Sequence, residues 1–312
     1  MKPMKITIVG AGAMGCLFAA LLSKSKEEVW LLDKDAGRAS HIQEQGIKLE
    51  GISGEWTAKV NATHLPEKIG STNLVIICVK SYNTKEAALK VEPLITPQTM
   101  VLTLQNGVGN LEIIGEVVGQ EKVVGGVTNH GATLLGVGSI RHAGSGDTVI
   151  GRLDGKIPVQ LRQIREVFNK TGIDTRISRD IRGSIWSKLI INVGINALTA
   201  LTRLNNGKLV EFEGTRRILR EAVTEAVKVA KKKRIKLIYD DPLAKVEAVC
   251  EATAANISSM LQDVLRQRHT EVDFINAVIV REGQSLGIPT PVNSVLLGLI
   301  KTIEQSYGII IK

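Results

Sequence analysis

A glycine-rich turn near the N-terminus constrains the fold of this 312-residue chain more than any other feature. The apolar run that begins at Lys5 ends at the sequence Gly10-Ala11-Gly12-Ala13-Met14-Gly15, and a helical pattern follows. In such a turn, the first glycine allows a tight bend, the second lets the backbone approach a pyrophosphate, and the third lets helix and strand pack closely. The helix N-terminus favours the phosphate charge. We therefore predict that these six residues bind a dinucleotide.

Short aliphatic runs alternate with helical patterns through the first half of the chain. Strands are expected at 5–10, 29–33, 74–80, 100–105, 123–129 and 174–177, and helices at 14–25, 37–46, 84–91 and 158–171. Residues 47–60 have the pattern of a hairpin, and residues 139–142 and 148–150 alternate like antiparallel strands. Strands separated by helices indicate parallel βαβ units with helices on both faces of the sheet.

The second half of the chain lacks strand patterns, and helical patterns take their place. They run through 185–201, 215–232, 241–254, 259–266, 271–286 and 291–307. We place the boundary within residues 178–182, which gives an α/β domain at 1–180 and an all-α domain at 181–312.

The net charge of +9 can indicate nucleic acid, an acidic membrane or small anions as the binding partner. The densest cationic run, Lys231 to Arg234, follows a helical segment and is typical of a solvated helix C-terminus. Aromatic residues, which stack on bases, make up only 3% of the chain, and no nucleic-acid-binding motif accompanies the charge. We therefore expect small anionic ligands and no nucleic acid.

Hydrophobic residues make up 44% of the chain, enough to fill an aliphatic core and to exclude a disordered protein. The sequence has no run of about 18 uncharged apolar residues, and the N-terminal apolar run is too short for a signal peptide. The scattered cysteines, Cys16, Cys78 and Cys250, are typical of free thiols in a reducing compartment. We expect a cytoplasmic protein with no membrane partner and no metal site.

The end of the second predicted strand bears on which dinucleotide binds. Asp33 can accept a hydrogen bond from a ribose 2′-hydroxyl, as in NAD enzymes. Lys34 and Arg38 can instead hold a 2′-phosphate, as in NADP enzymes. The two cations favour NADP, with NAD as the alternative.

Two further polar side chains follow predicted strands. Lys80 ends the strand at 74–80, and Asn106 follows the strand at 100–105. Ligands of open α/β sheets bind at the carboxyl ends of the strands, so this pair suits the ribose and nicotinamide end of a dinucleotide. The plain alternative is a capping lysine and an ordinary Asn-Gly turn.

A polar stripe interrupts the apolar helical pattern at 185–201. Lys188, Asn192 and Asn196 are spaced four residues apart and therefore share one helix face. Buried asparagines need polar partners, which a substrate carboxylate or hydroxyl would supply. Reduction of a ketone leaves an alkoxide, and Lys188 can donate a proton to it and stabilise its charge. The alternative is a stripe on the surface.

A second polar cluster includes Asn256, Ser258 and Ser259, and it continues into the segment around Glu271. Thr270 is expected to cap a helix that ends at Gly287, with Asp273 at its third position. Glu271 would then lie in the first turn, where the helix dipole favours the ionised carboxylate. Either Glu271 pairs with Lys188 and a substrate hydroxyl, or it is simply a favourable first-turn acid.

Five segments together resemble the ketopantoate reductase family along essentially the whole chain. They are the glycine-rich turn, Val79-Lys80, Gln105-Asn106-Gly107-Val108-Gly109, the run from Trp186 to Asn192, and the run from Arg268 to Asn276. The last two are the more specific. The resemblance implies a Rossmann-type domain followed by an all-helical substrate domain, with possible homodimerisation through the latter. It also implies NADPH-dependent reduction of 2-dehydropantoate to (R)-pantoate, a step toward pantothenate and coenzyme A.

The resemblance also assigns roles to individual residues. Lys188 falls on the catalytic lysine, the proposed proton donor, and Glu271 falls on the carboxylate that engages a substrate hydroxyl. The substrate-binding positions of the family fall on Asn192, Asn196 and Ser259, and also on Asn206 and Asn256. Its cofactor-side positions fall on Lys34, Lys80 and Asn106.

Two other functions fit the same scaffold. One is the reduction of a different branched 2-oxo acid, because a fold does not fix the substrate. The other is a sensor that binds the dinucleotide without turnover. The set formed by Lys188, Asn192, Asn196 and Glu271 argues against a sensor, which needs no proton donor.

Overall fold

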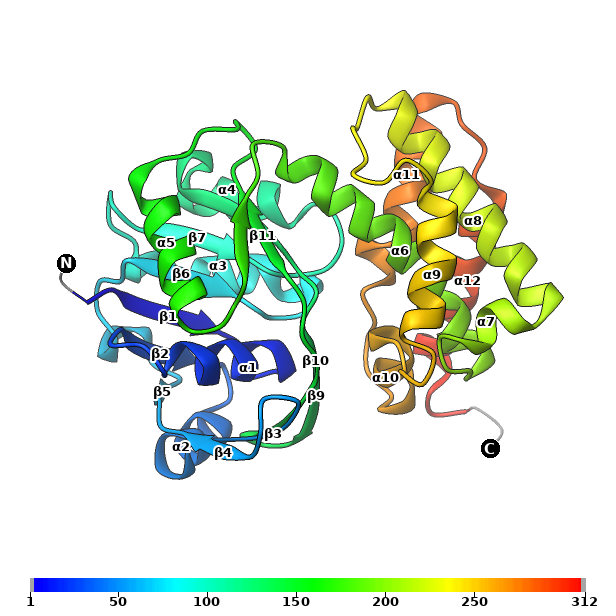
Figure 1. Cartoon of the computed structure of the whole chain (residues 1–312). Coiled ribbons are helices and arrows are strands. Elements are labelled where there is room, and N and C mark those ends of the chain that lie inside the picture. The colour runs from blue at the N-terminus through cyan, green and yellow to red at the C-terminus, as the bar shows by residue number, and fades with distance from the viewer. Residues whose placement is uncertain (1–2, 310–312) are drawn as a thin grey trace. The chain divides into compact units, whose positions relative to one another are not determined.

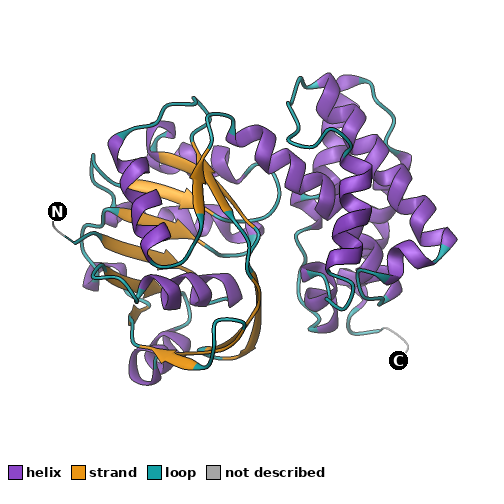
Figure 2. Ribbon diagram, in the orientation of Figure 1, coloured by secondary structure: helices purple, strands orange, loops and turns teal. Residues whose placement is uncertain are grey.

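The computed structural model describes residues 3–309, which form two compact units. Of these residues, the first unit comprises 3–105 and 109–181, and the second comprises 182–309 together with the short segment 106–108. Figure 1 traces the chain, and Figure 2 shows that, among residues 3–309, strands are confined to the first unit and the second unit is built from helices. This is the α/β domain followed by an all-α domain that the sequence predicts.

An eight-stranded sheet forms the centre of the first unit (Figure 1). Its strands, in spatial order, are β12 (Thr175–Ile177), β11 (Thr148–Gly151), β8 (Val123–Thr128), β7 (Met100–Thr103), β6 (Leu74–Ile77), β1 (Lys5–Val9), β2 (Glu28–Leu32) and β5 (Asn61–Thr63). Neighbours from β8 to β5 run parallel, and only the β11–β8 pair is antiparallel. Strands β6 and β7 are buried along their whole length, as expected for a sheet covered on both faces.

A second, four-stranded sheet lies in the same unit. Its strands are β4 (Trp56–Ala58), β3 (Ile47–Gly51), β10 (Ser139–Gly144) and β9 (Gly131–Gly136). The predicted hairpin at 47–60 is the antiparallel β3–β4 pair, and β10 pairs antiparallel with β9. The sequence did not predict that β10 also pairs parallel with β3, about 90 residues away along the chain.

In the part of the chain that the structure describes, five α-helices accompany the sheets of the first unit. They are α1 (Ala13–Leu22), α2 (Ala36–Gln45), α3 (Thr84–Val91), α4 (Asn110–Val118) and α5 (Val159–Lys170). Short 3-10 turns lie at Pro66–Lys68, Ser81–Asn83, Glu92–Leu94 and Gln120–Lys122. Helix α4 was not predicted. One continuous aliphatic core joins α1, the sheets and α5, and Phe18 and Phe168 are its largest fully buried side chains.

The second unit is a bundle of helices around its own core. They are α6 (Ile181–Thr202), α7 (Lys208–Glu211), α8 (Glu213–Lys232), α9 (Pro242–Ala252), α10 (Ser259–Leu265), α11 (Asn276–Leu286) and α12 (Pro291–Ser306). Helix α6 is long and apolar enough to cross a membrane, but 67% of its most apolar window is buried inside the protein. It is therefore the central helix of this core, and its buried side chains include Leu189, Val193 and Leu198.

The helix predicted at 271–286 begins later than expected. Residues Val272–Phe274 form a 3-10 turn, and α11 starts only at Asn276. Ile275 separates the two with φ −116° and ψ −90°, a conformation outside the helical region. The helix ends at Gly287, whose φ of +68° supplies the expected left-handed cap. Glu271 therefore lies in an irregular segment and not in the first turn of an α-helix.

Candidate active site

The glycine-rich turn has the backbone geometry that a pyrophosphate site needs. Gly10 has φ +101°, and a Cβ at Gly15 would lie only 1.9 Å from the Gly10 carbonyl oxygen. A Cβ at Gly12 would meet no atom within 4 Å, so this glycine borders open space. Gly12 is also the N-cap of α1, and it has no side chain to accept from the first N–H groups of the helix. These donors and the open approach fit the phosphates of a dinucleotide.

Asp33 belongs to the framework of this turn. Its side chain is only 4% exposed, and Oδ2 accepts a hydrogen bond of 2.7 Å from the Ala11 amide. Oδ1 accepts from the Asp35 amide and from the guanidinium of Arg38, at 2.6 Å for the closest nitrogen. The carboxylate after β2 thus joins the glycine-rich turn to the start of α2. The sequence placed Asp33 correctly but did not reveal these three partners.

The two cations expected to hold a 2′-phosphate are each paired with a carboxylate. The guanidinium of Arg38 forms an ion pair with the Asp33 carboxylate. Lys34, which is exposed, lies 3.2 Å from Glu86 of α3. Their charges are therefore partly neutralised within the protein itself.

Polar groups also follow β6 and β7 in the first unit. Lys80 is half-buried and precedes the 3-10 turn Ser81–Asn83. The side-chain amide of Gln105 donates to the Val79 carbonyl at 2.9 Å and to Thr84 Oγ1 at 2.8 Å. Gln105 therefore ties the ends of these two strands together, a role that the sequence analysis did not assign.

Asn106 belongs to a short segment that is held by the second unit. The Val108 amide donates to the Phe274 carbonyl at 3.1 Å. Gly107 has φ +86°, and a Cβ there would lie 2.4 Å from the same carbonyl oxygen. Glycine is thus required at position 107 by this close backbone approach, and the half-buried Asn106 precedes it.

The predicted polar stripe lies on the central helix α6. Lys188 and Asn192 are half-buried, and Asn196 is only 5% exposed. The Nδ2 atom of Asn192 is buried and has no hydrogen-bond partner among residues 3–309. Since an unpaired buried amide is costly, Asn192 fits a site that a polar ligand completes.

Lys188 is the candidate proton donor, and its surroundings tune it for that role. Burial lowers the pKa of Lys188 from its ordinary value to about 8, and the carboxylate of Glu271 opposes this shift. Glu271 is only 6% exposed and comes from the irregular segment before α11. The predicted pairing of this lysine with this carboxylate is consistent with that charge interaction. A lysine with a pKa near neutrality is better matched to proton transfer than an ordinary one.

The remaining substrate-side candidates lie on the loops that precede α7 and α10. The Asn206 amide donates to the Asn256 carbonyl at 3.0 Å, and the Asn206 side chain donates to Thr253. The Asn206 side-chain oxygen is buried without a partner in the described chain, whereas Asn256 is exposed. Ser259 is the half-buried first residue of α10.

Ser258, next to Ser259, has a structural role. It caps α10 by accepting from the Leu261 amide, and it also accepts from the Thr199 hydroxyl of α6 at 2.7 Å. These contacts tie the loop that carries Ser259 to the helix that carries the polar stripe.

Protein-family models match both parts of the chain. The family "Ketopantoate reductase PanE/ApbA" matches residues 6–155, and the family "Ketopantoate reductase PanE/ApbA C terminal" matches residues 180–304. A 2-dehydropantoate 2-reductase of Pyrococcus abyssi is 37% identical over 98% of this chain and 99% of its own length. That of Halobacterium salinarum is 32% identical over 97% of this chain and 99% of its own length.

Solved structures agree. A PanE/ApbA family ketopantoate reductase from Ralstonia eutropha has a TM-score of 0.91 and 34% identity, covering 98% of this chain and all of that one. A D-mandelate dehydrogenase in complex with NADH and anilino(oxo)acetate has a TM-score of 0.91 and 30% identity, with the same coverage of both chains. The chain therefore belongs to the ketopantoate reductase family and is an oxidoreductase with an N-terminal Rossmann-type domain.

Proposed function

We propose that this protein reduces 2-dehydropantoate to (R)-pantoate, with a nicotinamide dinucleotide bound at the glycine-rich turn. The observation that carries the proposal is the polar stripe of α6, where Lys188, Asn192 and Asn196 share one helix face and the buried Nδ2 atom of Asn192 has no hydrogen-bond partner among residues 3–309. Several relatives that are 32–37% identical along the whole chain have the name of this activity.

When bound, the dinucleotide would supply a hydride to the ketone carbon of the substrate. The protein contributes binding, orientation and a proton. The backbone of Gly10 to Gly15 would hold the pyrophosphate, and Lys80 and Asn106 would serve the cofactor side of the site. Asn192, Asn196 and Ser259, with Asn206 and Asn256, bind the polar groups of the substrate.

Lys188 then delivers its proton to the oxygen of the former ketone. Its positive charge also stabilises the negative charge that develops on that oxygen. Glu271 accepts a hydrogen bond from a substrate hydroxyl and, through its charge, favours the protonated form of Lys188. These are the roles that the family resemblance implies.

For the cofactor, the contacts at the end of β2 support NADH better than the NADPH expected from the sequence. Arg38 and Lys34 already face Asp33 and Glu86. A 2′-phosphate would bring its negative charge next to the buried Asp33 carboxylate, whereas a ribose hydroxyl would donate to it. The dissociation constants of NADH and NADPH, measured by calorimetry, decide between the two.

The Asp33→Asn variant sharpens this measurement, because it removes the charge and keeps the shape of the side chain. In this variant we expect the affinity for NADPH to rise about tenfold relative to the affinity for NADH, which corresponds to about 1.4 kcal/mol of binding free energy. Glu86→Gln, which releases Lys34, is the matched control for the second cation. Tighter binding of NADPH than of NADH by the unaltered protein would contradict the proposed preference.

A second candidate is the reduction of an aromatic 2-oxo acid. The similarity to D-mandelate dehydrogenase, at 30% identity and a TM-score of 0.91, supports it. Steady-state rates with 2-dehydropantoate, 2-oxoisovalerate and phenylglyoxylate separate the candidates. The proposal requires the highest kcat/KM for 2-dehydropantoate, and a higher value for phenylglyoxylate would replace it with the second candidate.

We also propose that the protein is cytoplasmic and dimeric. Val295 and Leu299 are exposed apolar side chains spaced one turn apart on α12, a surface that a second copy can cover. Sedimentation equilibrium of the protein and of a Val295→Glu variant tests the dimer, which the charge should dissociate.

A further inference from the structure

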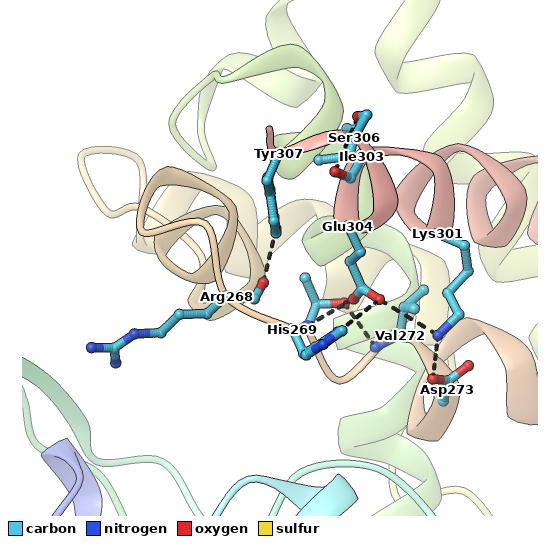
Figure 3. A network of polar contacts seen from close by, with 10 residues as sticks. Arg268, His269, Val272, Asp273, Lys301, Ile303, Glu304, Ser306 and Tyr307 are labelled. Carbon is cyan, nitrogen blue, oxygen red and sulfur yellow. Dashed lines mark hydrogen bonds and ion pairs between the residues drawn. The ribbon is translucent and has the colours of Figure 1, made fainter. Parts of the chain in front are cut away.

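A buried carboxylate on α12 lies at the centre of a polar network beside the segment that carries Glu271. Figure 3 shows this carboxylate, Glu304, with the side chains around it. Its side chain is only 4% exposed. Oε2 lies 3.5 Å from Lys301 Nζ and 3.5 Å from His269 Nδ1. Neither of these two contacts is short, and both partners are considerably more exposed than Glu304 itself.

The short contacts of Glu304 are made with Thr270, the residue just before Glu271. Oε1 of Glu304 accepts from the Thr270 amide and from the Thr270 hydroxyl, each at 2.7 Å. The sequence predicted Thr270 as the cap of a helix with Asp273 at its third position. Asp273 instead accepts from Lys301 at 2.7 Å, and the carboxylate that accepts from the Thr270 amide is the distant Glu304.

The segment 268–274 is fixed along its length. At its start, the Tyr307 hydroxyl of the α12 C-cap donates to the Arg268 carbonyl at 2.8 Å (Figure 3). In its middle, the Thr270 hydroxyl accepts from the Val272 amide. At its end, the Phe274 carbonyl accepts from Val108, two residues after Asn106.

Helix α12 is itself anchored at its other end. The buried carboxylate of Glu225, on α8, accepts hydrogen bonds from the amides of Val292 and Asn293 at 2.9 and 3.0 Å. It also accepts from the Asn293 side chain at 2.7 Å. These bonds satisfy N–H groups in the first turn of α12 and hold in place the helix that carries Glu304.

We propose that Glu304 is a positioning residue for catalysis: by binding Thr270, it fixes Glu271 in place next to Lys188. The inference rests on the proposed roles of Glu271 and Lys188. The contacts are made to the residue adjacent to Glu271, and a small displacement of a catalytic group is costly. If Glu304 acted only through an ion pair, its role would depend on Lys301. The Lys301 side chain is 38% exposed and lies 3.5 Å from Glu304, so this pair is weak.

Three variants separate positioning from ion pairing. Glu304→Ala removes both acceptors of Thr270. Glu304→Gln removes the charge, but its amide oxygen can still accept both bonds. Lys301→Met removes the ion pairs with Glu304 and Asp273 and leaves Thr270 bound, so it is the matched control.

The first readout is catalysis with 2-dehydropantoate. We expect kcat to fall by about 10- to 100-fold in Glu304→Ala. Glu304→Gln and Lys301→Met should stay within about threefold of the unaltered protein.

The second readout does not depend on the substrate. The pKa of Lys188 can be measured by NMR on lysines labelled with isotope-enriched methyl groups and assigned with Lys188→Arg. Glu271 raises this pKa, so displacement of Glu271 in Glu304→Ala should lower it. If the unaltered protein does not reduce 2-dehydropantoate, the proposed function fails and this readout still decides the present inference.

An unchanged Lys188 pKa and kcat in Glu304→Ala would overturn the proposal. Equal changes in Lys301→Met would also overturn it, since they would assign the effect to the ion pair. Thermal unfolding of each variant checks that it is folded. If Glu304→Ala does not fold, Thr270→Val removes the hydroxyl bond to Glu304, together with the bond that this hydroxyl accepts from Val272, and must lower both the Lys188 pKa and kcat.

Discussion

Adding one methyl group to Gly12 should impair cofactor binding and leave the fold intact. Gly12 has φ −80° and ψ −176°, a conformation open to any residue, and an added Cβ would meet no atom of the protein within 4 Å. The same methyl would occupy the space through which a pyrophosphate approaches the start of α1. Loss of one or two charge-assisted hydrogen bonds costs about 2–4 kcal/mol. This corresponds to roughly 30- to 1000-fold weaker binding.

Gly15→Ala is the contrasting variant. Its Cβ would lie 1.9 Å from the Gly10 carbonyl oxygen, so the helix or the turn must shift. Such overpacking costs about 1–3 kcal/mol, which lowers Tm by several degrees in a unit of this size. Gly12→Ala should change stability by less than about 1 kcal/mol.

Two measurements test this pair of variants. Calorimetric titration gives the dissociation constant of NADH and NADPH for Gly12→Ala, and differential scanning calorimetry gives Tm for both variants. Binding by Gly12→Ala within threefold of the unaltered protein would refute the proposed pyrophosphate site. A normal Tm for Gly15→Ala would refute the close approach of helix and turn.

Two further predictions concern pH. Lys188 must be protonated to act as the acid, and its pKa is about 8. We therefore expect kcat to decline as pH rises through about 8. A kcat that stays constant up to about pH 10 would exclude Lys188 as the proton donor. His130 and His142, bonded to each other at 3.0 Å, both have a pKa lowered mainly by burial. A depressed pKa adds stability that is present above the ordinary value of 6.5 and is lost as pH falls through the folded-state value. The free energy of unfolding, measured with urea, should therefore fall between pH 7 and pH 5 by up to about 1.4 kcal/mol per pH unit for each histidine. In His130→Phe the slope of this free energy against pH should be smaller. Equal slopes in the two proteins would contradict the expected role of His130.

The parts of the fold that the sequence predicted are those with strong periodicity or a local motif. Helices α8 and α12 lie within two residues of their expected bounds, and the glycine-rich turn joins a strand to a helix as expected. Helix α4 was missed because Gly115 interrupts a short apolar run whose period is ambiguous. The late start of α11 was missed because the backbone break at Ile275 has no sequence signal.

In the candidate site, too, the sequence predicts the features that depend on local spacing and misses those that depend on tertiary contacts. Lys188, Asn192 and Asn196 share a helix face, so their spacing alone predicts that they lie together. The partners of Asp33 and the role of Glu304 depend on tertiary contacts. Thr270 and Glu304 are 34 residues apart, whereas the sequence placed Asp273 at the third position of the expected helix. A local rule identifies which groups need partners but not which distant side chain supplies them.

The most direct test of the central claim is the turnover of Lys188→Met with 2-dehydropantoate and saturating cofactor. Methionine keeps the length and the apolar stem of the side chain but has no proton to donate. We expect kcat to fall by roughly 10²- to 10⁴-fold, while the dissociation constant of the cofactor stays unchanged. A loss of less than tenfold would contradict the claim that Lys188 is the proton donor of this enzyme.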